Sequence, residues 1–192
     1  ILDSHDAGDK LSVQVLRFEE QVRLTGEFNG DELSESESFA EAIEETAGGL
    51  AAGTEYSEYV TVSDDSGTLS VQVPAEWADV DGTPISLGDQ QYPNVEAAPD
   101  RGAFRSSWSD PGLSLSAVGP EAGTPQELLS MLADSASTEC TDAGSQEYSD
   151  GLYSGQMQIL TNCGGTGAAT VLIAAQPEGG EFTALVLMQI LS

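Results

Sequence analysis

Positive charge is scarce in this sequence. Among 192 residues there are 33 Asp and Glu but only five Lys and Arg, which gives a formal net charge of −28 at pH 7. Proteins bind nucleic acids and anionic membrane surfaces chiefly through clusters of Lys and Arg, so the composition argues against both classes of partner. The excess of acid favours a strongly solvated surface suited to a salty medium, where screening weakens self-repulsion. A site for a cation or a basic partner is the alternative.

Histidine is scarcer still, since His5 is the only one. A Ser/His/Asp triad needs a histidine base beside its nucleophile, and no Gly-x-Ser-x-Gly turn accompanies His5. A phosphate-binding loop of the Walker type needs a Gly-Lys pair, and the single lysine, Lys10, is not part of one. We therefore expect no catalytic and no cofactor-binding residues, and this segment is not expected to be an enzyme.

Metal-ligand patterns are also missing. One histidine and two cysteines without a metal-binding spacing cannot form a Cys/His zinc site. The stretch "DVDG" at 79–82 begins like a calcium loop but lacks the later acidic ligands, so we interpret it as a turn. No metal-binding residues are therefore predicted.

The two cysteines are Cys140 and Cys163. A disulfide between them is the favoured interpretation, and two free buried thiols are the alternative. The disulfide would close a loop of about twenty residues and stabilise the fold by about 3 kcal/mol. Because disulfides persist in oxidising compartments, we expect an extracytoplasmic location, secreted or in the cell envelope.

Long apolar runs are absent too. No stretch approaches the roughly 18 consecutive apolar residues that a membrane-spanning helix needs. The opening "ILDSHDAGDK" has neither the basic start nor the apolar run of a signal peptide. For an exported protein, this leads us to expect that the chain is a fragment or a processed form.

Alternating apolar and polar residues in the first part of the chain predict strands. One hairpin is expected from the runs at 11–17 and 21–28, and a second from the runs on either side of the turn "SDDSG" at 63–67. The acidic stretch between the hairpins carries a short helical pattern from about Ser38 to Thr46. We therefore divide the chain into a hairpin unit at 1–33, an acidic linker with a short helix at 34–56, and a main domain at 57–192.

The main domain is predicted to be α+β. Its strongest helix spans 124–137, with Thr124 as cap, Pro125 at the first helical position and Glu127 three residues after the cap. A loop is expected up to about Pro93. After it we expect a strand in "NVEAAPD", a helical turn in "DRGAFRSSW", a strand at 112–118, and four closing strands near 144–149, 152–161, 167–175 and 181–191.

Short glycine-rich turns join these last four strands, so they should pair consecutively and antiparallel. The last two are apolar at nearly every position, which indicates central strands covered on both faces. The expected fold is therefore an antiparallel sheet with helices packed on it, and the helix at 124–137 is the candidate cover for one face.

Two further features could carry chemistry. The glycine-dense "TNCGGTGAAT" at 161–170 offers no cation or histidine to activate its thiol, so we interpret it as a strand end, half of a disulfide and a tight turn. A group of aromatic residues could line a ligand cleft, although core positions are the favoured interpretation. They are Trp77, Phe104, Trp108, Tyr148 and Tyr153.

The beginning of the chain resembles a known family. "SHDAGDKLSVQVLR" at 4–17, with the strand that follows, resembles the last part of the PDZ domain in HtrA-type, trypsin-like serine proteases. The resemblance covers residues 1–33 and implies a partial PDZ β-hairpin. The peptide-binding strand and the protease triad of that family would lie upstream, so none of their functional residues is carried over to this chain.

The remainder resembles the C-terminal domain appended to the PDZ unit in some actinobacterial and related bacterial members. The matching features are "VPAEW", "AAPD", "DGLYSG" and "TNCGGTG", and the layout is similar to a PsbP-like α/β sandwich. The resemblance implies a non-catalytic accessory region of an exported serine protease, which acts through protein partners or the upstream protease domain. An independent extracytoplasmic binding domain for a small ligand or a cation is the alternative.

Overall fold

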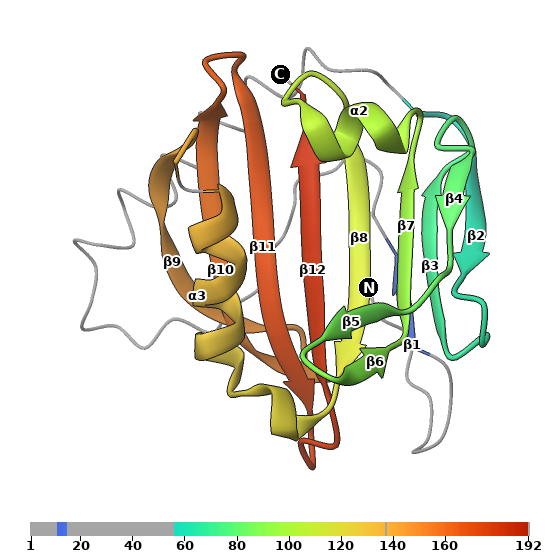
Figure 1. Cartoon of the computed structure of the whole chain (residues 1–192), viewed down its shortest axis with the longest axis vertical. Coiled ribbons are helices and arrows are strands. Elements are labelled where there is room, and N and C mark those ends of the chain that lie inside the picture. The colour runs from blue at the N-terminus through green and yellow to red at the C-terminus, as the bar shows by residue number, and fades with distance from the viewer. Residues whose placement is uncertain (1–10, 15–55, 137, 192) are drawn as a thin grey trace.

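The central element of the fold is a seven-stranded antiparallel sheet (Figure 1). The computed structural model of the chain describes residues 11–14, 56–136 and 138–191. The strand order is β4-β7-β8-β12-β11-β10-β9. The strands are β4 (Asp79–Asp81), β7 (Asn94–Ala98), β8 (Gly112–Val118), β9 (Thr141–Ser149), β10 (Tyr153–Cys163), β11 (Ala168–Pro177) and β12 (Thr183–Ile190).

The four closing strands form the predicted meander. Each of β9, β10 and β11 pairs antiparallel with the next strand along the chain, as the sequence pattern predicted. The last of them, β12, also pairs with β8, which joins the meander to the rest of the sheet. On β12, Leu185 and Leu187 pack into one hydrophobic cluster while Ala184, Val186 and Met188 pack into another. Apolar clusters therefore lie on both faces of this central strand, as expected.

One face of the sheet carries the helix α3 (Pro125–Ala136), which packs on β10, β11 and β12 (Figure 1). Its buried face includes Leu128 and Leu129, and the cluster that it joins contains Leu160, Leu172 and Leu185 from the three strands. A single turn of 3₁₀ helix, η1 (Pro120–Ala122), precedes it. Both the predicted helix and its predicted place on the sheet are confirmed.

The opposite face carries the second predicted hairpin. Its strands, β2 (Tyr59–Ser63) and β3 (Leu69–Pro74), pair antiparallel. Leu69, Val71 and Val73 of β3 share a cluster with Val95 of β7 and Leu113 of β8, among others. The described chain is therefore α+β, with a small sheet on one face of the large sheet and a helix on the other.

The first described strand, β1 (Leu11–Gln14), lies beside β3 and runs parallel to it. The small sheet thus has the order β1-β3-β2. The sequence pattern predicted this strand but not its pairing with β3. The alternation of apolar and polar residues within a strand does not indicate which distant strand it pairs with. The predicted strand at 21–28, the helical pattern at 38–46 and His5 lie outside the described residues, as does most of the chain at 1–56 that we divided into a hairpin and a linker.

Two predictions for the segment before Pro93 are wrong. The loop expected before Pro93 contains the edge strand β4 and a small hairpin of β5 (Ile85–Leu87) and β6 (Gln90–Tyr92). The "DVDG" turn is likewise a strand over its first three residues. Each of these strands has three residues, which is too short to show a period, and the Gly, Pro and Asp between them are typical of turns.

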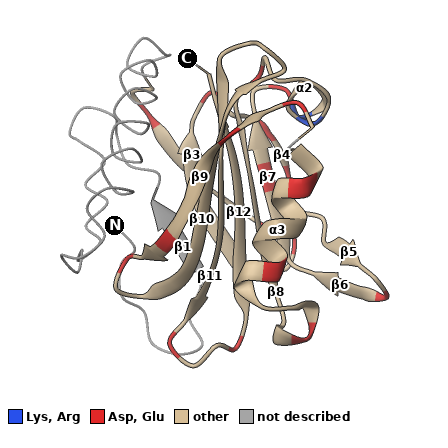
Figure 2. Ribbon diagram, turned by 90° about the vertical axis from the view of Figure 1, so that its left-hand side faces the viewer, with Lys and Arg blue, Asp and Glu red and all other residues tan. Residues whose placement is uncertain are grey.

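The helix α2 (Arg101–Ser106) follows β7 and lies at one end of the sheet (Figure 1). Asp100 caps it by accepting a hydrogen bond from the Ala103 N–H. Carboxylates are spread over the turns and edges of the described elements, whereas the only basic side chains there lie on α2 (Figure 2).

Candidate ligand-binding site

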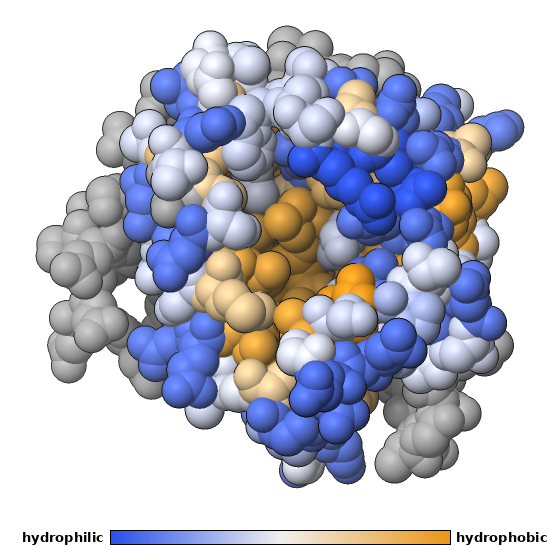
Figure 3. All heavy atoms as spheres, viewed as in Figure 1, coloured by the Kyte–Doolittle hydropathy of each residue, from blue (hydrophilic) through white to orange (hydrophobic). Residues whose placement is uncertain are grey.

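The face of the sheet that carries α3 is hollowed beside that helix (Figure 3). Comparison with Figure 1, drawn from the same side, places the hollow between α3, the β5–β6 hairpin and α2, above the middle of the sheet. On this face of the sheet, half-buried apolar side chains from three elements pack against the α3 cluster: Ile85 and Leu87 of β5, Leu132 of α3 and Leu187 of β12. We call this feature the apolar hollow. Concave, mainly apolar surfaces of this kind are typical of small-molecule sites.

The hollow lies between two elements that cover this face of the sheet from opposite sides. Helix α3 covers β10 to β12 from one side, and the β5–β6 hairpin reaches over β8 from the other. The hairpin is held by Tyr92, whose hydroxyl donates to Glu121 Oε1 of η1 at 2.8 Å. This hydrogen bond raises the pKa of Tyr92, and the pKa of Glu121 is lowered by its own backbone N–H and, next, by the Tyr92 hydroxyl. The wall opposite α3 is thus tied to the segment from which α3 begins.

The floor of the hollow changes from apolar to polar across the strands. Leu187 of β12 stands in register with Leu172 on β11 and with Ser114 on β8. On β7, Glu96 stands in register with Ser114, and Asn94, which is only 2 % exposed, stands in register with Ser116. Its Oδ1 accepts hydrogen bonds from Ser114 Oγ at 3.2 Å and from Ser116 Oγ at 2.9 Å. Asn94, Ser114 and Ser116 therefore form a polar shelf at one side of an apolar floor.

The amide group of Asn94 is held in place through its oxygen. None of the hydrogen bonds between described residues uses its Nδ2 group as donor. Every fully buried side-chain nitrogen or oxygen in the described part of the chain does have a partner. Asn94 lies on the face of β7 opposite to Val95 and Ala97 of the other cluster and is almost completely buried there.

Both arginines of α2 are held by carboxylates. Arg101 donates through Nε to Asp79 Oδ1 at 2.9 Å and through Nη1 to Asp81 Oδ2 at 2.6 Å. Arg105 donates through Nε to Glu96 Oε2 at 2.7 Å. Three carboxylates thus surround two guanidinium groups, so this cluster carries a surplus of negative charge.

The pKa values of two of these carboxyl groups are lowered. Hydrogen bonds from the Thr83 hydroxyl and N–H, with a further contribution from Arg101, lower the pKa of Asp81 to about 2. The side chain and N–H of Arg101 lower the pKa of Asp79. These groups remain charged at neutral pH and keep the arginines occupied.

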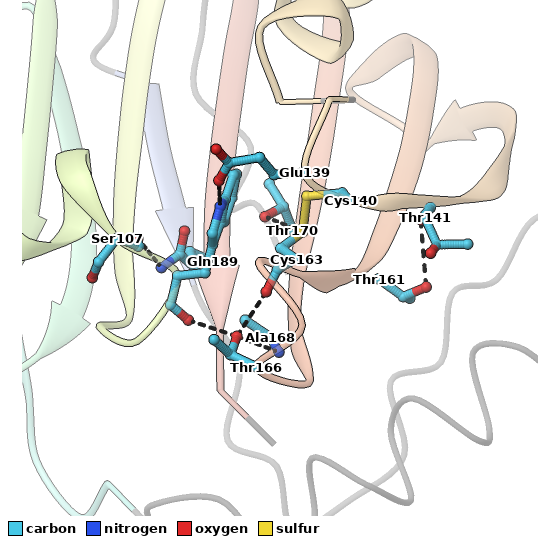
Figure 4. The surroundings of a disulfide bond; sticks show 11 residues. Ser107, Glu139, Cys140, Thr141, Thr161, Cys163, Thr166, Ala168, Thr170 and Gln189 are labelled. Atoms are coloured by element: carbon cyan, nitrogen blue, oxygen red, sulfur yellow. Dashed lines mark hydrogen bonds between the residues drawn. A yellow bond between two sulfur atoms is a disulfide. The ribbon is translucent and has the colours of Figure 1, made fainter.

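The predicted disulfide is present: Cys140, which follows α3, is bonded to Cys163 at the end of β10 (Figure 4). Thr166 donates from Oγ1 to the Cys163 carbonyl at 2.8 Å, and the Gly164 N–H donates to the Glu139 carbonyl at 2.7 Å. The glycine-dense stretch is therefore a strand end, half of a disulfide and a tight turn, as predicted. A disulfide is compatible with an oxidising compartment.

The five aromatic residues that could have lined a cleft do not form one group, although Trp108 packs against the α3 cluster. Trp77 and Phe104 are buried in the core, as favoured. Trp108 is half-buried beside the disulfide, where its Nε1 donates to a Glu139 carboxylate oxygen. Tyr148 and Tyr153, on β9 and β10, are half-buried as well.

The sequence reasoning missed the hollow. Ile85 and Leu87, two residues apart in a Gly-, Pro- and Asp-rich stretch, were the only local signal of an apolar face there. Asn94, Ser114 and Leu187 looked like ordinary strand residues, because only the tertiary structure brings them together.

In the described part of the chain, no three His, Cys, Asp or Glu side chains are grouped so as to hold a metal ion. No helix of that part is long and apolar enough to cross a membrane. Comparison of the chain with protein-family models, with curated proteins and with solved structures finds no match.

Proposed function

We propose that this chain is a non-catalytic binding region that works outside the cytoplasm, and that its recognition site is the apolar hollow. The observation that carries the proposal is the half-buried Leu187 on the central strand β12, which packs against the same cluster as the half-buried Ile85 and Leu132 of two other elements, on the face that Figure 3 shows to be hollowed. Apolar side chains in such a position lose contact with water when a ligand fills the hollow, which favours binding by about 25 cal/mol per Å² of apolar surface.

The residue types support binding rather than catalysis. The chain has one histidine, and the arginines of the described part are held in ion pairs. Hydrolysis by a Ser/His/Asp mechanism requires a base and an oriented nucleophile. The disulfide supports a place in an oxidising compartment.

The resemblance of residues 1–33 to the end of a PDZ domain supports a more specific place for the chain. In this proposal it is the C-terminal accessory region of an exported, HtrA-type serine protease, and the main domain is a PsbP-like sandwich. The hollow would then let a bound molecule influence the upstream protease domain or a protein partner. The sequence patterns that support this are "SHDAGDKLSVQVLR", "VPAEW" and "TNCGGTG".

The test is a fluorescence titration with Nile red, an uncharged apolar dye. We expect saturable binding to the wild-type chain. Leu187→Glu places a charge on the floor of the hollow and should weaken binding at least about tenfold, because an unpaired charge is costly to desolvate. Met131→Glu is the matched control, since Met131 is 44 % exposed on α3, and it should bind as the wild type does. Circular dichroism checks that both variants fold.

Two results would contradict the proposal. One is the absence of saturable Nile red binding to the folded chain, and the other is equal loss in the Leu187 and Met131 variants. Labelling of this chain by a serine-directed fluorophosphonate, together with cleavage of casein, would contradict its non-catalytic part.

A further inference from the structure

We infer that the outer edge of β9 is a docking site for an extended, basic segment of a partner protein, which adds a strand to the large sheet. This inference concerns the edge of the sheet farthest from β4 and does not depend on the apolar hollow. It follows from the pairing and length of β9, from the turn that holds its end and from the charge of the chain.

The strand β9 has a strand partner on one side only. It is the last strand of the large sheet, and within the described part of the chain it pairs with β10 alone (Figure 1). In an antiparallel pair, alternate backbone N–H and C=O groups of each strand point away from the partner strand. An extended segment of another protein can therefore bind along β9 through the same backbone hydrogen bonds that join the strands of the sheet.

The two edges of the large sheet differ in length and protection. At one edge, β4 has only three residues, and both of its aspartates accept hydrogen bonds from Arg101. At the other edge, β9 has nine residues, and those at 144–149 pair with β10 without a shift of register. Natural sheet edges are commonly protected by short strands, bulges, proline or lysine. The stretch 144–149 contains neither proline nor lysine and is long enough to pair with a peptide.

The end of β9 is held by the turn that leads to β10. Asp150 Oδ1 accepts hydrogen bonds from the Leu152 N–H at 2.9 Å and from the Tyr153 N–H at 2.7 Å. Asp150 Oδ2 accepts a third hydrogen bond from the Tyr148 hydroxyl of β9 at 2.9 Å. This part of the edge is therefore ordered before a partner binds, which lowers the conformational entropy that binding costs.

The charge of the chain distinguishes a basic partner from a second copy. The charged side chains of β9 are Asp142 and Glu147, and both are exposed carboxylates. Pairing of two copies along β9 would bring together two chains that each carry a net charge of −28. Like charges on neighbouring strands also destabilise their pairing, whereas opposite charges stabilise it. A segment with Lys or Arg at alternate positions can place its positive charges on the face that carries Glu147.

Fluorescence anisotropy with three labelled peptides tests the chemistry of the partner. The first alternates Lys and Val, the second alternates Glu and Val, and the third is the Lys–Val peptide with methyl groups on its backbone nitrogens, which keeps the charge but removes the donors. We expect the first peptide to bind at least about tenfold more tightly than either of the others. Equal or tighter binding of the second or third peptide would overturn the inference, as would a dimer of the chain that the first peptide dissociates.

A charge-reversal variant tests the place of binding. Glu147→Lys should weaken binding of the Lys–Val peptide about fivefold, because like charges then lie on neighbouring strands. Glu58→Lys is the matched control, since it makes the same change at an exposed position just before β2 of the small sheet, and it should weaken binding less than about twofold. Circular dichroism checks that both variants fold. In the wild type, the peptide should slow hydrogen exchange of the amides at 144–149. Equal weakening in the two variants, or slower exchange only outside 144–149, would overturn the role of β9.

Discussion

Gly164 allows the loop that carries Trp108 to pack on the turn beside the disulfide. Its φ angle is +59°, and a Cβ atom at this position would clash with Trp108 Cδ1. The neighbouring Gly165 has a similar φ of +69° but open space around it. Substitutions at the two positions therefore separate the effect of left-handed backbone on stability from the effect of a close contact with Trp108.

We expect Gly165→Ala to reduce the free energy of unfolding by about 1 kcal/mol, because left-handed backbone is unfavourable for residues with a Cβ. Gly164→Ala should reduce it by about 2–4 kcal/mol, because it adds a clash with the indole ring of Trp108. Urea unfolding measures both values. Equal losses in the two variants would contradict the packing of Trp108 on this turn.

A second prediction at the residue scale concerns pH. The pKa of Asp81 is lowered to about 2 from an ordinary value of 3.8 by hydrogen bonds from Thr83 and by Arg101. A carboxyl group whose folded pKa is depressed contributes stability above its unfolded pKa, and this contribution is lost as the pH falls through the folded pKa. The stabilisation by Asp81 should therefore be present at neutral pH and disappear between about pH 3.8 and pH 2.

Asp81→Asn removes this charge with little change of shape. We expect it to lower the free energy of unfolding by about 1 kcal/mol at neutral pH, a value reduced by solvent screening of a partly exposed pair. The difference in the free energy of unfolding between the variant and the wild type should vanish near pH 2. Urea unfolding across this pH range measures it, with Asp89→Asn at the exposed β5–β6 turn as a control that should not change stability. A difference independent of pH would show that the charge of Asp81 is not the cause.

At the scale of elements, α3 begins with a reciprocal pair of hydrogen bonds. The Thr124 N–H donates to Glu127 Oε2 at 2.9 Å, and the Glu127 N–H donates to Thr124 Oγ1 at 3.3 Å. This capping box satisfies donors that the first turn of a helix leaves free. It was predictable from four residues of sequence, because every partner is local.

Thr124→Ala should lower the free energy of unfolding by about 1 kcal/mol, since it removes one side of the capping box. Ser130→Ala, an exposed position within the same helix, should change it by less than about 0.5 kcal/mol. Thermal and urea unfolding of both variants provide the comparison. An equal effect at the two positions would mean that the cap does not stabilise α3.

The disulfide ties the segment after α3 to the end of β10. Thiol titration of the denatured protein should find reactive thiols only after reduction. The double variant Cys140→Ser with Cys163→Ala should lose about 3 kcal/mol of stability, because the unfolded chain regains the freedom of a loop of 23 residues. Alanine is chosen at position 163 because Cys163 is fully buried. Two reactive thiols before reduction would contradict the bond.

The elements that sequence patterns predicted share one property. The strands of the closing meander and the helix α3 each repeat their apolar residues with a period set by one buried face or by full burial. The strands β4, β5 and β6 are too short to show such a period, and their pairing depends on β7 and on each other. The apolar hollow could not be predicted either, because Leu187 and Ile85 are distant in the sequence and come together only when the sheet is complete.

At the scale of the whole molecule, the main feature is the net negative charge. With −28 at neutral pH, the folded chain repels itself, and added salt shortens the range of this repulsion from about 30 Å at 0.01 M to about 3 Å at 1 M. We expect the melting temperature to rise steadily with NaCl over this range. Sucrose at matched osmolality is the control, since it does not screen charge. A melting temperature that is insensitive to NaCl, or that rises equally in sucrose, would contradict the argument.

The position of β12 sets the order in which this molecule can form during synthesis. Although it is the final described strand, it lies between β8 and β11, and it supplies the pairing partner that each of them needs on one side. A growing polypeptide therefore leaves the ribosome with the middle of its sheet missing until residue 190 has been added. Folding of the large sheet is then a late, concerted event, and the apolar strands that precede β12 must be kept apart from other chains until that moment.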